Sequence, residues 1–220
     1  MDNPNYYAQK IYQSLCELNL FEYSKKHKKL IIVAPESTFP FPINIHKDQI
    51  TFWSNVLPDN AYFLFGSQRI ENQKVYQSII ILNKCRIINF YDKKHLILFT
   101  EELNKIFKNF SWAKTLFLTG KSEISNGEKN NQNKFFSLGL KWCILPQICS
   151  EFFWNFDQQY LDVKRIKFSD ESGITFLFVN DSWFIKYFRK TMQNLVYLKS
   201  VQYNLPILYI AHEDFCLITS

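Results

Sequence analysis

Short apolar runs that alternate with segments of helical period constrain this 220-residue chain more than any other feature of its sequence. The run 30–33 is apolar at every position, so a strand formed there must be covered on both faces. Residues 6–24 instead carry apolar side chains at helical spacing. Strands that are apolar on both faces and alternate with helices predict a layered α/β fold.

The same patterns assign the other elements. We expect helices at 6–24, 47–57, 151–161 and 184–201, and strands at 30–33, 61–65, 75–82, 86–91, 138–145, 174–179 and 205–211. The polar segment 121–134 is rich in Asn, Ser, Glu and Lys, and we expect it to be a mobile insertion. We find no internal repeat, and a single domain covering 1–220 accounts for the pattern.

Composition and charge exclude several classes of protein. A hydrophobic content of 47% excludes a disordered chain, and only five glycines argue against a phosphate-binding loop. Five cysteines without a C-x-x-C pair give no zinc site and no disulfide framework. The net charge of +6 lies in short runs such as 25–29, which indicate a solvated helix end rather than a nucleic-acid-binding face. We expect no signal peptide, no membrane span, no metal and no cofactor, so the chain taken alone should be soluble.

Three polar residues stand where expected strands end. Glu36 follows the strand 30–33, where desolvation would raise its pKa and make it a general base; the alternative is a turn with a helix-capping acid. Lys93 follows the strand 86–91 and, if it is turned inward, could stabilise an oxyanion; the alternative is a surface lysine.

Cys149 stands where a strand gives way to a helix. The helix dipole would lower the pKa of its thiol and favour the thiolate. The backbone N–H of Ser150 would then be available to bind an oxyanion. An inert buried cysteine is the alternative interpretation.

The order Glu–Lys–Cys at strand ends resembles the carbon–nitrogen hydrolase (nitrilase) superfamily, because open α/β sheets place their sites at these ends. The motifs P-E-S-T-F-P-F-P (35–42), Y-D-K-K-H-L-x-x-F-T-E (91–101), I-C-S-E (148–151) and V-N-D-S-W-F (179–184) narrow the resemblance. They look like the nitrilase-like domain of apolipoprotein N-acyltransferase, from about residue 5 to the C-terminus. The resemblance implies a layered αββα sandwich.

The resemblance also implies a two-step acyl transfer. Cys149 would take a fatty acyl chain from a phospholipid as a thioester and pass it to the N-terminal amine of a diacylglyceryl-cysteine apolipoprotein. Glu36 would be the base, and Lys93 would stabilise the tetrahedral oxyanion. Glu101 and Glu151 would orient the lysine and the site. The residues that would form a loop beside the pocket are Asn180, Asp181, Trp183 and Phe184.

The chain departs from that family in several places. The family's membrane helices, first strand and last strands are missing, so the sandwich should be incomplete and one sheet edge unpaired. Thr100 and Asp214 stand where the family uses glycine, and Ser150 where it uses tyrosine. By resemblance, the domain would work on the periplasmic face of the bacterial inner membrane, with a separately encoded membrane-helix bundle. A soluble amidase or nitrilase with the same triad, and an inactive remnant of the acyltransferase, are the alternatives.

Overall fold

The computed structural model describes residues 3–84, 86–96, 124–127, 138, 142–154, 172–181, 186–211 and 216–219. The helices are α1 (Pro4–Glu17), α2 (Leu20–Lys26), the 3-10 turn η1 (Ile43–Ile45), α3 (Lys47–Ser54), α5 (Glu151–Trp154) and α7 (Lys186–Tyr203). The strands are β1 (Leu30–Val33), β2 (Phe39–Pro42), β3 (Ala61–Glu71), β4 (Lys74–Asn83), β5 (Arg86–Asp92), β6 (Trp142–Ile148), β7 (Ser172–Phe178), β8 (Ile207–Ile210) and β9 (Cys216–Thr219).

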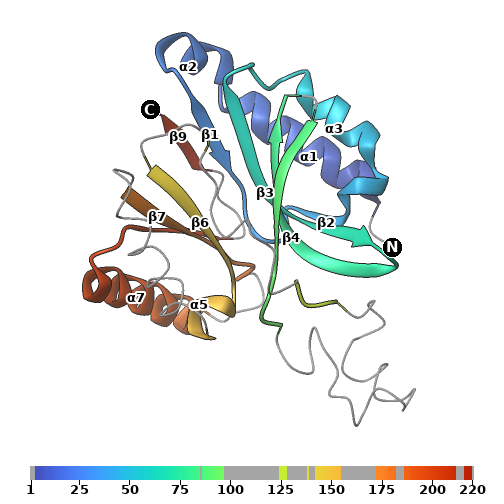
Figure 1. Cartoon of the computed structure of the whole chain (residues 1–220). Coiled ribbons are helices and arrows are strands. Elements are labelled where there is room, and N and C mark those ends of the chain that lie inside the picture. Colours follow the sequence, from blue (N-terminus) through green and yellow to red (C-terminus); the bar gives the residue numbers. More distant parts are fainter. Residues whose placement is uncertain are drawn as a thin grey trace.

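The strands form two sheets, which lie against each other in Figure 1. The larger sheet has the order β5-β4-β3-β1-β9, with β2 also paired to β3. In it, β1 is parallel to β3, whereas β4 is antiparallel to both β3 and β5. The smaller sheet has the order β6-β7-β8 and is parallel throughout. As a result, β1, β3 and β5 all run in one direction across the larger sheet.

Alternate residues of the inner strands enter two different hydrophobic cores. In β1, Leu30 and Ile32 pack with the side chains of α1 and α3, whereas Ile31 and Val33 pack with the smaller sheet. The strands β3 and β4 alternate in the same way. This two-residue period explains why the run 30–33 is apolar at every position.

Helices cover the outer faces of both sheets. Trp53 of α3 is fully buried in the first core, where its indole N–H donates to the Ala8 carbonyl of α1. On the other side, Val196 of α7 enters the second core, and α7 packs along β8 (Figure 1). The expected α/β layering, helix–sheet–sheet–helix, is therefore confirmed.

Residues 6–24 do not form one continuous helix. The chain breaks at Asn19, whose φ of 49° is left-handed, a conformation that asparagine tolerates better than most residues. The break divides the segment into α1 and α2 and turns Leu20 into the core. The helical period did not reveal this, because one left-handed residue changes the path of the chain without disturbing the pattern on either side.

The larger sheet contains more strand than the sequence suggested. The strands β3 and β4 extend beyond 61–65 and 75–82 and meet at Asn72 and Gln73, both with left-handed φ, as a tight hairpin turn requires. Two strands were not expected at all. The first, β2, was missed because it contains two prolines, which argue against a strand in the middle of a sheet. Among the described strands it pairs with β3 only, at a position where proline can be tolerated.

The second unexpected strand, β9, is the last strand in the order of the larger sheet. It runs antiparallel beside β1, with Ile32 opposite Leu217. The backbone groups of β1 are therefore paired on both sides, by β3 and by β9. In the described part of the chain, this edge of the sheet is therefore formed by β9, which comes from the far end of the sequence.

Other predictions are only partly covered by the structure. Of the segment 121–134, residues 124–127 are described: Ile124 bridges to Val75, and the Gly127 N–H donates to the Lys93 carbonyl at 2.8 Å. The expected helix 151–161 is described only over α5. Across the described residues, no helix combines the length and the apolar character needed to cross a membrane.

Candidate active site

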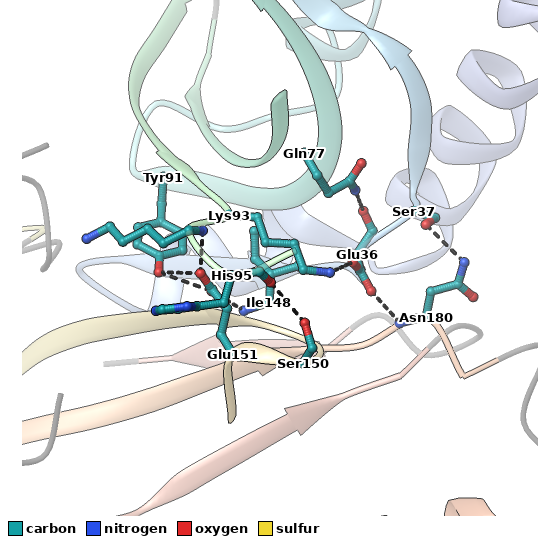
Figure 2. Close-up of polar contacts among 11 residues, drawn as sticks. Glu36, Ser37, Gln77, Tyr91, Lys93, His95, Ile148, Ser150, Glu151 and Asn180 are labelled. Carbon is teal, nitrogen blue, oxygen red and sulfur yellow. Dashed lines mark hydrogen bonds and ion pairs between the residues drawn. The ribbon is translucent and has the colours of Figure 1, made fainter. Parts of the chain in front are cut away.

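The polar residues at the strand ends come from both sheets. Glu36 follows β1 and Lys93 follows β5, which run in the same direction. From the smaller sheet, Cys149 follows β6 and Asn180 follows β7. Figure 2 shows Glu36 and Lys93 facing the segments that hold Ile148–Glu151 and Asn180. The strand ends of the two sheets therefore meet in this region.

Glu36 and Lys93 form a buried ion pair. The Lys93 Nζ lies 3.1 Å from Glu36 Oε1, and the lysine is completely buried. The second carboxylate oxygen of Glu36 accepts the Asn180 N–H at 3.0 Å. Lys93 is therefore turned inward and is not a surface lysine. Burial of two charges is costly, so such a pair is weak evidence of stability and directs attention to chemistry.

A glycine in β3 makes room for Glu36. A Cβ at Gly66 would lie 1.7 Å from the Glu36 carbonyl oxygen, so only glycine fits there. The Gly66 N–H donates to the Pro35 carbonyl at 2.9 Å, which extends the pairing beyond the end of β1. The segment 34–36 is thus held directly against β3.

Cys149 lies at a tight bend between β6 and α5. Its φ is 48°, a left-handed conformation that is uncommon outside glycine and that clusters at functional sites. Its N–H donates to the Phe178 carbonyl at 2.8 Å, which ties the end of β6 to the end of β7. The Ser150 hydroxyl donates to the His95 carbonyl at 3.0 Å. Among the described residues, the Ser150 N–H has no hydrogen-bond partner.

Glu151 connects the lysine segment to the cysteine segment. One carboxylate oxygen accepts the Lys94 N–H at 2.5 Å and the other accepts the Ile148 N–H at 2.9 Å. The Tyr91 hydroxyl lies 3.0 Å from both oxygens. Burial raises the pKa of Glu151, while these hydrogen bonds and the charge of Lys93 oppose the rise.

Asp181 and Tyr209 are two further polar residues of the smaller sheet's side of the site. Asp181, which follows β7, is buried and lies 4.0 Å from the Arg189 guanidinium. Burial, and then the charges of Asp181 and of a Cys149 thiolate, raise the pKa of Tyr209 on β8 to about 12. The expected pocket residue Asp181 therefore lies close to Tyr209.

Some expected site residues cannot be placed, and others were missed. Glu101, Trp183 and Phe184 lie outside the described residues, as do Thr100 and Asp214. Gly66 and Gln77 were not identified from the sequence. An isolated glycine within the apolar run 61–66 is a recognised signal of close backbone approach. A glutamine within an apolar strand gives no comparable signal.

The comparisons with known proteins show the fold. No protein-family model and no curated protein matches the sequence. Among solved structures, a glutamine-dependent NAD+ synthetase from Acinetobacter baumannii is similar over 99% of this chain and 38% of its own length (TM-score 0.60, 14% identity). One from Cytophaga hutchinsonii is similar over 96% of this chain and 33% of its own (TM-score 0.58, 9% identity).

A third similar structure is named for its superfamily. XC1258 from Xanthomonas campestris, a CN-hydrolase superfamily protein with an arsenic adduct in its active site, matches 96% of this chain and 71% of its own length (TM-score 0.55, 12% identity). The chain spans only about a third to two fifths of the two synthetases. The similarity to these three structures shows that the chain has a nitrilase-like fold.

Proposed function

We propose that this chain is a cysteine-dependent acyl-transfer domain, in which Glu36, Lys93 and Cys149 form the catalytic triad. The observation that carries the proposal is the buried Glu36–Lys93 ion pair, which faces the cysteine segment from the opposite sheet. We further propose that the reaction is N-acylation of a diacylglyceryl-cysteine apolipoprotein with a phospholipid acyl chain. The motifs 91–96 and 179–184 support this acyltransferase assignment within the fold.

In the first half-reaction, Glu36 takes the proton of the Cys149 thiol, and the thiolate attacks the carbonyl carbon of a phospholipid ester. The Lys93 ammonium and the Ser150 N–H stabilise the tetrahedral oxyanion. The ester C–O bond then breaks, and the lysophospholipid oxygen leaves with the proton held by Glu36. The acyl chain remains on Cys149 as a thioester.

In the second half-reaction, the N-terminal amine of the apolipoprotein attacks this thioester. Glu36 accepts a proton from the attacking nitrogen, the C–S bond breaks, and the Cys149 sulfur is protonated again. Water must not replace the amine, so the site has to be dry. The nearly complete burial of Glu36, Lys93 and Cys149 suits that requirement.

The substrates imply a membrane surface. A phospholipid donor and a lipid-bearing acceptor would reach this domain at the periplasmic face of a bacterial inner membrane, beside a membrane-helix bundle. Copurification of the chain with such a bundle is the expected outcome in a bacterial membrane extract.

An amidase is the second candidate function. Two of the similar structures are glutamine-dependent synthetases, so the same fold serves proteins that use an amide nitrogen. In that case the same triad would attack a small amide, release ammonia and hydrolyse the acyl-enzyme with water.

Intact-mass measurement in phospholipid–detergent micelles tests the proposal. We expect a mass increase of one fatty acyl chain that disappears in Cys149→Ala and persists in Cys143→Ala, a matched control because Cys143 is buried in β6, the strand that leads to Cys149. Ammonia release from glutamine or short amides, without an acyl adduct, would establish the amidase. A cooperatively folded protein with neither activity would support the inactive remnant.

A further inference from the structure

We infer that Gln77 is a positioning residue that sets the placement of Glu36 relative to Lys93. Its side-chain Nε2 donates to the Glu36 carbonyl at 2.9 Å, and its main-chain carbonyl accepts the Lys93 N–H at 2.8 Å. Figure 2 shows the Gln77 amide directed at the Glu36 backbone. One residue of β4 therefore bonds to the backbone of both partners of the ion pair. The inference rests on the proposed roles of Glu36 and Cys149.

The position of Gln77 in the sheet explains why it can do this. The ladder between β4 and β5 pairs Ser78 with Asp92, and the bond from the Lys93 N–H to Gln77 continues this ladder beyond the end of β5. β4 lies between β3 and β5, and the Gln77 side chain extends toward the segment that follows β1. It is a buried glutamine in a mostly apolar strand.

Gln77 and Gly66 hold the Glu36 segment in different ways. Gly66 bonds to the carbonyl of Pro35 and allows the close approach, whereas Gln77 bonds to the carbonyl of Glu36 itself. Without the Gln77 amide, the Glu36 carbonyl loses this hydrogen bond and can rotate, while the bond from the Gly66 N–H to the Pro35 carbonyl stays. Rotation of that peptide redirects the carboxylate, which must reach both the Lys93 Nζ and the Asn180 N–H.

The consequence should appear in the reactivity of Cys149. A general base has to lie within hydrogen-bond reach of the proton it removes, and displacement by about 1 Å can cost a rate on the order of 100-fold. If Gln77 positions Glu36, loss of its amide will slow thiolate formation without exposing the cysteine. A purely structural role would instead loosen the fold and expose the thiol.

The experiment compares Cys149 alkylation by iodoacetamide in the wild type and in Gln77→Met, measured by peptide mass spectrometry. Methionine keeps the length of the side chain and the main-chain carbonyl but removes the donor. We expect Gln77→Met to react about 10- to 100-fold more slowly at neutral pH, as Glu36→Gln does. The loss should shrink as pH rises, because an alkaline solution favours the thiolate without a protein base. Both substitutions leave the other ionisable groups of this region unchanged, namely Lys93, Glu151, Asp181 and Tyr209.

Two controls separate positioning from loss of stability. Gln49→Met removes an equally buried amide that donates to Asn5 and Asp48 in the outer helical layer, and it should leave the Cys149 rate unchanged. Cys143, buried in β6, is an internal control, because a loosened fold would speed alkylation of both cysteines.

The outcomes distinguish the inference from the proposed function. Slow Cys149 alkylation in Glu36→Gln with a normal rate in Gln77→Met overturns the inference and leaves the triad intact. Faster alkylation of both cysteines in Gln77→Met also overturns it. An unchanged rate in Glu36→Gln contradicts the base role of Glu36, and the inference fails with it. If Gln77→Met does not fold, Gln77→Glu, which replaces the donor with an acceptor of the same shape, decides by the same criteria.

Discussion

Two consecutive residues, Asp92 and Lys93, belong to two buried ion pairs that are built differently. Asp92 accepts two bonds from Arg69, at 2.6 and 3.2 Å, and a third from the Ser78 hydroxyl at 2.6 Å. The Arg69 guanidinium also lies 4.0 Å from the centre of the Phe90 ring. Lys93, by contrast, contacts one oxygen of Glu36 at 3.1 Å.

The difference shows how a reactive pair can be kept in place. A bidentate arginine–carboxylate contact fixes both partners in one orientation. A lysine ammonium instead makes a single contact, and its side chain can move to another position without losing several hydrogen bonds at once. The Arg69–Asp92 pair therefore anchors the end of β5. Lys93, the next residue, is not needed for that anchoring and can serve the reaction. Four substitutions test this division, from the largest expected effect to the smallest.

Replacing Asp92 should have the largest effect on stability. Asp92→Ala leaves the Arg69 guanidinium buried without its main partner, and we expect the free energy of unfolding to fall by about 3–5 kcal/mol. Chemical denaturation measures the change. Asp59→Ala is the control, because the Lys84–Asp59 pair is exposed and exposed pairs contribute little. Equal losses in the two variants would contradict an anchoring role for Arg69–Asp92.

Replacing Lys93 should mainly affect the reaction. Lys93→Met removes the proposed oxyanion donor, and we expect the rate of acyl-adduct formation to fall by about 100- to 1000-fold. Time-resolved intact-mass measurement gives the rate. The neighbouring Lys94→Met, whose Nζ lies over the Tyr91 ring, should keep nearly the wild-type rate. A similar loss in both variants would mean that the segment, rather than the Lys93 ammonium, is required.

Replacing both partners of the Glu36–Lys93 pair should affect stability least among the ion-pair variants. Glu36→Gln/Lys93→Met removes both buried charges, and such replacements are neutral or stabilising by about 1–4 kcal/mol. Each single variant should be less stable than the double variant, which a double-mutant cycle will show. A double variant less stable than either single one would indicate that the pair is structural, like Arg69–Asp92.

Glu151 should show the smallest effect, a change in pH dependence. Burial raises its pKa above the ordinary 4.5, so the folded state binds this proton more tightly than the unfolded state. Its contribution to stability must therefore fall as pH rises from 4.5 through the folded pKa. Melting of wild type and Glu151→Gln across this range should show the wild-type advantage shrinking.

Glu22 is the control for this prediction, because its contribution to stability should change with pH in the opposite direction. The pKa of Glu22 is lowered, chiefly by its hydrogen bond with Lys25 and by the charge of that lysine. Any stabilisation that it provides must grow as pH rises, although its exposure makes the effect small. A wild-type advantage over Glu151→Gln that grows with pH would contradict the burial of a carboxyl group whose pKa is raised.

The strand-end residues of the site could be identified from the sequence because each is a polar residue that follows an apolar run in the same segment. Glu36, Lys93 and Cys149 each follow an apolar strand, and strands that run in the same direction end at the same edge of a sheet. Arg69 and Gln77 gave no such signal, because both lie inside strands. A polar residue inside a strand can face solvent or the interior, and only its neighbours across the sheet decide which.

The sequence by itself determined the layers of this protein. Strands that are apolar at every position can exist only between two covered faces, and that requirement fixed the α/β sandwich. Tertiary structure decided which distant segments meet: β9 pairs with β1, and Glu36 bonds to Gln77, Lys93 and Asn180, which lie 41, 57 and 144 residues along the chain. The apolar pattern of a segment indicates only which of its own residues will be buried. Register and contact between segments depend on burying all the apolar faces and pairing all the buried polar groups at once.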